Sequence, residues 1–88
     1  MHFITTWTFK PEHAKDVSQR FLDTGGTPPE GITLIGRWHD VSSGRGFSIV
    51  ETDDPIAISK WCHQWYDLLS FEIIPVVDDK QLSVILGG

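Results

Sequence analysis

The stretch from Glu51 to Val77 constrains the fold more than any other part of this 88-residue chain. It contains the end of a strand, the start of a helix and a second strand in direct succession. Asp54 is suited to cap the helix, because its carboxylate accepts hydrogen bonds from the free backbone N–H groups at a helix start. Pro55 suits the first helical position, where a missing N–H costs nothing. The stretch therefore predicts a helix with a fixed start and a strand on either side.

An apolar stripe predicts the length of this helix. Its members recur at three- and four-residue spacing: Ile58, Trp61, Cys62, Trp65 and Leu68 or Leu69. Residues at this spacing share one helix face. We expect the helix to end between Leu68 and Ser70 and a strand to begin at Phe71. Two tryptophans four residues apart on such a stripe are typical of a core rather than of a ligand-stacking site.

The remaining elements follow from hydrophobic period and from glycine and proline positions. We expect strands over residues 2–9, 32–41, 45–52 and 71–77. A first helix begins at Lys10-Pro11-Glu12 and ends at Gly25-Gly26. Its expected buried stripe is Ala14, Val17, Ser18, Phe21 and Leu22. The segment 78–88 fits either a strand, because its apolar residues alternate, or a short helix.

The order strand, helix, strand, strand, helix, strand predicts an α+β fold of the ferredoxin-like βαββαβ type. We expect one domain over residues 1–88, with a four-stranded antiparallel sheet and both helices on one face. Cys62 is the single cysteine, which excludes an internal disulfide and fits a reducing compartment. No apolar run approaches the length of a membrane span and no signal pattern is present, so a cytoplasmic protein is expected.

Apolar residues point to both faces of the predicted sheet, although two helices cover only one. A face that met water would alternate to polar residues. We expect the uncovered face to carry large apolar side chains: Trp7, Trp38, Phe47, Ile49 and Phe71. Monomers rarely leave such a patch open. The sequence therefore predicts a two-fold homodimer, sheet against sheet, with room between the sheets for a small apolar or aromatic ligand.

Several motifs are together similar to one family. They are Phe9-Lys10-Pro11, Pro29-Glu30-Gly31, Trp38, Phe47, Glu51-x-Asp53-Asp54, Trp61-x-x-x-Trp65-x-Asp67-Leu68 and Phe71-Glu72-x-x-Pro75-Val76. Over nearly the whole chain this set resembles DUF3303, a family of small bacterial domains of unknown function. The resemblance implies a dimeric α/β barrel with a ferredoxin-like protomer, but no activity. Its wider superfamily includes cofactor-free monooxygenases of the antibiotic-biosynthesis type, haem-degrading enzymes, isomerases and stress-response proteins.

Three polar residues are candidates for chemistry. Glu51 ends the third strand on the presumed dimer face, where apolar surroundings would raise the pKa of its carboxyl and suit it to acid–base work. Arg37 and His39 lie on the opposite side of their strand from Trp38, and an anionic group is one ligand they suit. The alternatives are structural: Glu51 bonds loop backbone or an arginine, and the other two lie on a solvated edge strand.

Two functional hypotheses follow. The first is a dimeric binding module for a small apolar or aromatic ligand. The second is a cofactor-independent monooxygenase or isomerase in which Glu51, His39 and Arg37 act together. We favour the first, because no nucleophile or acid–base pair is fixed by spacing. A cavity of a few hundred cubic ångströms in which these residues converge would favour ligand binding or chemistry.

The sequence argues against other kinds of site. No metal-ligand spacing is found among the four histidines: His2, His13, His39 and His63. No glycine-rich phosphate motif follows a strand, so we expect no cofactor. The segment Arg45 to Glu51 resembles the central strand motif of RNA-recognition domains. Ile49 replaces the second aromatic residue there, and the net charge of −5 opposes phosphate binding, so no nucleic-acid or membrane partner is expected.

Overall fold

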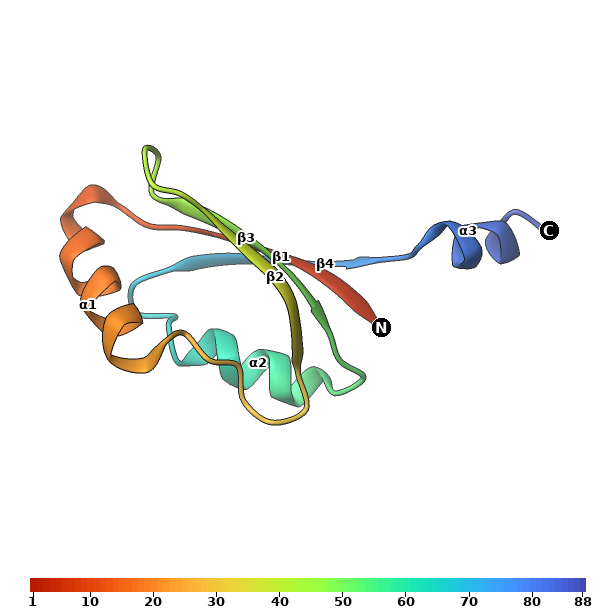
Figure 1. The fold of residues 1–88 in the computed structure, drawn as a ribbon, viewed down its shortest axis with the longest axis horizontal. Helices are drawn as coiled ribbons and strands as arrows, with labels where there is room; N and C mark the ends of the chain where they lie inside the picture. The colour runs from red at the N-terminus through yellow and green to blue at the C-terminus, as the bar shows by residue number, and fades with distance from the viewer.

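The computed structural model describes all 88 residues. Its elements are β1 (His2–Thr8), the 3-10 turn η1 (Pro11–His13), α1 (Ala14–Thr24), β2 (Thr33–Asp40), β3 (Arg45–Glu51), α2 (Pro55–His63), β4 (Ser70–Val76) and α3 (Asp79–Ile85). The strands form one antiparallel sheet in the order β2-β3-β1-β4. Helices α1 and α2 lie on one side of this sheet (Figure 1). This is the predicted ferredoxin-like arrangement, with a third helix at the C-terminus.

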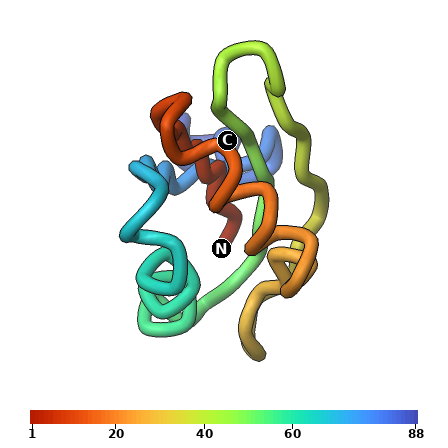
Figure 2. The backbone as a smooth tube through the Cα atoms, turned by 90° about the vertical axis from the view of Figure 1, so that its left-hand side faces the viewer, coloured from red at the N-terminus to blue at the C-terminus, as the bar shows by residue number.

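The two covering helices lie under different parts of the sheet. In Figure 2, α2 lies beneath the side of the sheet that ends in β4, and α1 lies towards the side that ends in β2. The outer strand β2 pairs irregularly with β3, because the register shifts between Leu34 and Gly36.

None of the helices is both long enough and apolar enough to cross a bilayer.

The predicted helix starts are confirmed, but one helix is shorter than expected. The Asp54 carboxylate accepts a hydrogen bond from the Ile56 N–H at 2.9 Å, and Pro55 occupies the first turn. The expected end of α2 between Leu68 and Ser70 is wrong, because the helix ends at His63. Beyond it the backbone makes tighter turns, such as the bond from the Trp65 N–H to the Cys62 carbonyl at 3.0 Å.

The C-terminal segment forms a helix rather than a strand. Asp78 and Gln81 make a capping box, in which each side chain accepts a hydrogen bond from the other's backbone N–H, at 2.8 and 3.0 Å. This local cap outweighs the alternating pattern that also allowed a strand. Helix α3 extends from β4 away from the rest of the molecule (Figure 1) and leaves Val84 and Leu86 more than two-thirds exposed.

Strand register decides which side chains share a face. Trp38 pairs with Phe47, and the Ile49 and Glu51 positions follow Phe47 on the same face of β3, away from the helices. Trp7 instead pairs with Gly46 and with Phe71, on the face that the helices cover. The prediction that Trp7 and Phe71 lie on the uncovered face is therefore wrong. Alternation within one strand gives two sets of residues, and only the pairing with the next strand says which set faces the helices.

The buried core is small. The apolar residues that lose nearly all contact with solvent are Val50, Ala57, Ile58, Trp65 and Leu69. They come from β3, α2 and the turns after α2. The hydroxyls of Thr5 and Ser48, which are both buried, hydrogen-bond to each other between the central strands. Few side chains of this protomer are therefore fully removed from water, which suits a chain that gains further burial from a partner.

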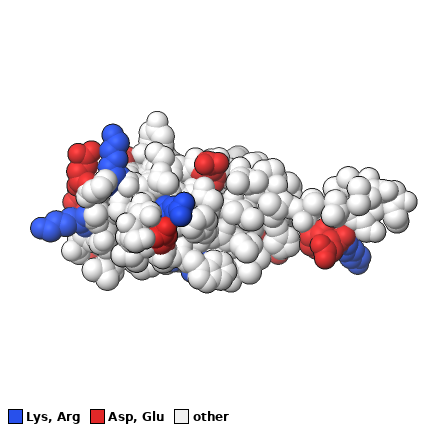
Figure 3. Space-filling view, turned by 90° about the horizontal axis from the view of Figure 1, so that it is seen from above, with Lys and Arg blue, Asp and Glu red and all other residues white.

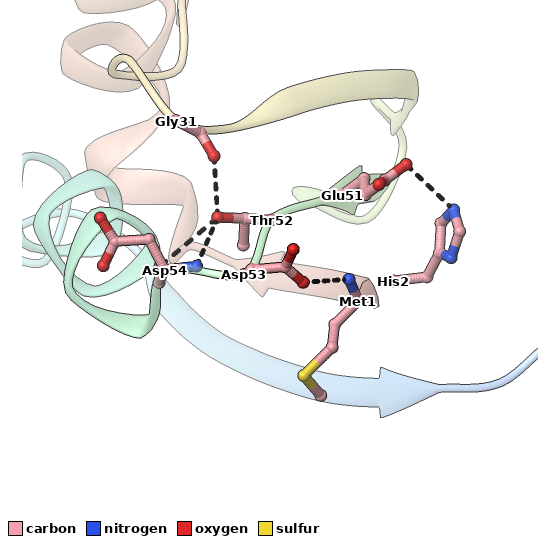
Figure 4. A network of polar contacts seen from close by, with 7 residues as sticks. All are labelled: Met1, His2, Gly31, Glu51, Thr52, Asp53 and Asp54. Atoms are coloured by element: carbon pink, nitrogen blue, oxygen red, sulfur yellow. Dashed lines mark hydrogen bonds and ion pairs between the residues drawn. The ribbon is translucent and has the colours of Figure 1, made fainter.

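Thr52 joins a loop to the start of α2 (Figure 4). Its hydroxyl donates to the Gly31 carbonyl at 2.8 Å and accepts from the Asp54 N–H at 3.0 Å. The side chain is only 4% exposed, so water cannot readily replace either bond. The long loop before β2 is thereby held against the helix cap.

We predict that Thr52→Val destabilises the fold by about 1–3 kcal/mol, because valine keeps the shape but leaves the Gly31 carbonyl and the Asp54 N–H without this partner. Urea unfolding followed by circular dichroism measures the change. Thr8→Val, at an exposed position of the same sheet, is the control and should stay within about 0.5 kcal/mol of the wild type. Equal effects of the two substitutions would contradict the role of Thr52.

Candidate functional site

A cavity of about 450 Å³ lies between the sheet and helices α1 and α2. Twelve of its nineteen lining residues are hydrophobic. Most of the aromatic wall comes from β1, β4, α1 and the segment 61–65: Trp7, Phe71, Phe21, Trp61 and Trp65. The inner side of α1 also carries two small residues, Ala14 and Ser18. No residue of α1 is buried, and Leu22 of its expected buried stripe is 76% exposed, so this helix does not fill the space above the sheet.

Trp7 forms part of the cavity wall because its cross-strand neighbour has no side chain. The Trp7 indole lies against Gly46, and a Cβ atom added to Gly46 would overlap the ring. Gly36 lies two residues before Trp38 on the same strand, and a Cβ atom added to it would overlap the Trp38 ring on the other face of the sheet. Glycine at these two positions therefore lets a tryptophan lie flat on each face.

Arg37 lies at one end of the cavity and is half-buried. Its two terminal nitrogens, Nη1 and Nη2, donate to the carbonyls of Gly26 at 2.7 Å and of Gly25 at 3.0 Å. Its guanidinium carbon lies 5.0 Å from the centre of the Phe21 ring. Burial lowers the pKa of Arg37 from its ordinary value. The positive φ of Gly25 (71°) and Gly26 (58°) turns the chain at the end of α1, next to both carbonyls.

His39 lies beside Arg37 at the rim. Its ring is edge-on to Trp7, at 5.9 Å between centroids, and to Phe21, at 5.4 Å. Partial burial, and then the charge of Arg37, lower the pKa of His39. A lowered pKa favours the neutral imidazole at pH 7, in which one nitrogen donates and one accepts.

Glu51 does not join these two residues. Its exposed carboxylate lies on the uncovered face, 3.6 Å from Nε2 of His2 (Figure 4). The structure therefore brings Arg37 and His39 together and places the third candidate on the opposite face. The convergence of all three that the enzyme hypothesis requires does not occur in this protomer.

The predicted ligand-binding residues divide in the same way. Trp7 and Phe71 line the cavity, whereas Trp38, Phe47 and Ile49 lie on the uncovered face. Any ligand contact by the latter three stays a prediction that depends on a partner at that face. Phe21 and Trp61 were not predicted as site residues, because an apolar stripe on a helix usually indicates a filled core. The small residues Ala14 and Ser18 on the α1 stripe were the one sequence sign of a space beside that helix.

An ion pair links α1 to the turn that follows α2, beside the cavity. Arg20 of α1 makes two parallel bonds to the Asp67 carboxylate, at 2.7 and 2.8 Å. It also donates to the Gln64 carbonyl at 2.9 Å and lies 5.4 Å over the Trp65 ring. The hydrogen bond from Arg20 lowers the pKa of Asp67 from its ordinary value. This link holds α1 to the turn after α2.

The structure gives little support for a cysteine nucleophile or for a metal ion at this site. Burial raises the pKa of the Cys62 thiol, which lines the cavity. A thiol with a raised pKa is a poor nucleophile. The structure has no group of three or more histidine, cysteine, aspartate or glutamate side chains that could hold a metal ion.

Comparison with known proteins gives a family and a fold. The family model described as "Domain of unknown function (DUF3303)" matches residues 1–88. No curated protein matches the chain. Among solved structures, a Deinococcus radiodurans protein provisionally described as an antibiotic biosynthesis monooxygenase is similar, with a TM-score of 0.50 and 15% identity. The similarity covers 88% of this chain and 92% of that one, and at this identity it shows the fold alone.

We predict that the link between Arg20 and Asp67 makes stability depend on pH. The pKa of Asp67 is lowered in the folded state. The contribution of this carboxylate to the free energy of unfolding is therefore present above the unfolded carboxyl pKa of about 4, and it is lost as pH falls through the lower folded pKa. At neutral pH the urea midpoint of the wild type should be higher than that of Asp67→Asn, and this difference in midpoint should disappear in acid. Glu30→Gln, at an exposed loop position, is the control; a gap that stays constant with pH would contradict the prediction.

Proposed function

The chain belongs to the DUF3303 family of domains of unknown function, and we propose that it is a homodimeric module that binds a small apolar or aromatic ligand. The proposed binding site is the cavity between the sheet and helices α1 and α2, which differs from the space between two sheets that the sequence predicts. The partner is a second copy, which covers the opposite face of the sheet.

The cavity is the observation that supports ligand binding. Its volume of about 450 Å³ falls within the range of roughly 300–1,000 Å³ that is typical of small-molecule sites. Its walls are mainly aromatic and aliphatic, with a few polar groups at one end, as in sites that bind an apolar body and orient it. Because Glu51 lies outside the cavity, this geometry favours binding over the enzyme hypothesis.

The uncovered face of the sheet supports the homodimer. Trp38 is 60% exposed, and Ile74 and Phe47 are about 40% exposed. Charged side chains gather at one end of the molecule and at the base of α3, and few lie over the middle of the face seen in Figure 3. An apolar face with a charged margin is the usual anatomy of an interface.

The chemistry of Cys62 supports a cytoplasmic location. It is a free cysteine, and a protein without disulfides is compatible with a reducing compartment. We propose the cytoplasm on this ground.

We predict that filling the cavity weakens ligand binding. Val17 lines the cavity, so Val17→Trp should place an indole in the space that the ligand needs. A neutral naphthalene fluorophore such as 6-propionyl-2-dimethylaminonaphthalene serves as the probe, and its titration should show at least about tenfold weaker binding, a loss of roughly 1.4 kcal/mol. The matched control is Lys15→Trp, an exposed position of the same helix that does not line the cavity. Absence of probe binding to the wild type, together with native mass spectrometry that finds no copurified small molecule, would contradict the proposed site.

We predict that Trp38→Glu dissociates the dimer, because a carboxylate would then be buried in the apolar interface. A buried interface aromatic residue contributes about 2 kcal/mol or more, so the dimer should weaken by roughly 30-fold or more in sedimentation velocity. Tyr66→Glu replaces an aromatic residue that is 74% exposed and is the control. A wild-type protein that sediments as a monomer at micromolar concentration would refute the dimer.

A further inference from the structure

Arg37 differs from the other arginines of the chain in having no acidic partner. Arg20 pairs with Asp67, and Arg45 pairs with Asp40 through a bond of 2.7 Å from its Nε. No carboxylate lies within ion-pair distance of Arg37, although this side chain is half-buried and lines a mainly apolar cavity. A cation in such surroundings is stabilised by an anion, because burying an unpaired charge is costly.

The contacts of Arg37 hold it in place without using all its donors. The carbonyls of Gly25 and Gly26 accept two of its five N–H groups, so three remain. These carbonyls belong to the end of α1, where the helix dipole favours a cation. The ring of Phe21 lies 5.0 Å from the guanidinium carbon and restricts it further. The group is thus held in advance of binding, which reduces the entropy lost when a ligand binds.

The neighbouring polar groups suit the same kind of ligand. Neutral His39 offers one N–H donor at the rim. Asp40 also lines the cavity, but its carboxylate already accepts bonds from Arg45 and from the Ser42 hydroxyl, both at 2.7 Å. Arg45, which is paired with Asp40, also lines the cavity, and most of the remaining wall is hydrophobic. One end of the cavity therefore carries a fixed, unpaired cation, and the rest accommodates a hydrocarbon body.

We infer that the ligand is an apolar monocarboxylic acid, whose aromatic or branched hydrocarbon body occupies the cavity and whose carboxylate binds Arg37. This inference rests on the proposed function and adds the chemical class of the ligand. Guanidinium and carboxylate form charge-assisted, parallel hydrogen bonds that are stronger than bonds between neutral groups. Arg37 therefore has two roles. It holds the end of α1, and it selects an acid as the ligand.

The test compares ligands of the same shape on the wild-type protein. Isothermal titration at neutral pH is made with 2-naphthoic acid, which is ionised, and with 2-naphthamide, which is neutral. We expect the acid to bind at least tenfold more tightly than the amide. If the amide binds as tightly as the acid or more tightly, the inference is wrong and the proposed apolar site stands. If neither compound binds, both the inference and the proposed function are contradicted.

Variants assign the preference to Arg37. Arg37→Met should remove the tenfold preference for the acid while binding of the amide is retained, and Arg37→Lys should give an intermediate preference because lysine lacks the planar fork. The control is Lys15→Gln, which removes a cation from an exposed position of α1 that does not line the cavity and should keep the preference. A preference that survives in Arg37→Met, or is lost in the control alone, would overturn the assignment. The comparison of acid with amide on the wild type decides the inference even where Arg37→Met fails to fold.

Discussion

The structure depends on how the aromatic side chains divide between the two faces of the sheet. On the covered face, the Trp7 indole lies flat against Gly46 and has Phe71 as its neighbour on β4. On the other face, Trp38 lies against Gly36 and beside Phe47. Two helices cannot cover both faces, so one face contributes the cavity and the other remains apolar and exposed. The small core of the protomer and both proposed interactions follow from this single limitation.

The sequence predicted the order of the elements because their signals are local. The cap at Asp54, the proline after it and the glycines after α1 each act within a few residues, and the structure confirms them. The faces of β1 and β4 could not be predicted in the same way. Whether Trp7 lies with the helices depends on its pairing with Gly46, a residue far away in the chain, and alternation within one strand does not contain that information.

The candidate site was predicted only in part, also for a physical reason. Arg37 and His39 were correctly placed on one face of β2, since both lie on the same side of a regular strand. Glu51 was correctly placed on the uncovered face with Phe47 and Ile49, so the enzyme hypothesis grouped residues that lie on opposite faces of the sheet. A hollow between helix and sheet is a property of side-chain volumes summed over several elements. A periodic stripe such as that of α1 therefore indicates which side faces inward, but not whether the interior is full.

The two outer strands carry a further consequence for how copies of this protein meet. The ladder of β2 is interrupted between Leu34 and Gly36, and β4 contains Pro75, which has no N–H to offer, before the chain leaves the sheet as α3. Neither border therefore presents a long, regular row of free backbone groups to a neighbouring chain. Sideways growth into a continuous ribbon or fibre is disfavoured at both borders. The proposed homodimer instead uses the broad apolar surface, which a single second molecule can cover.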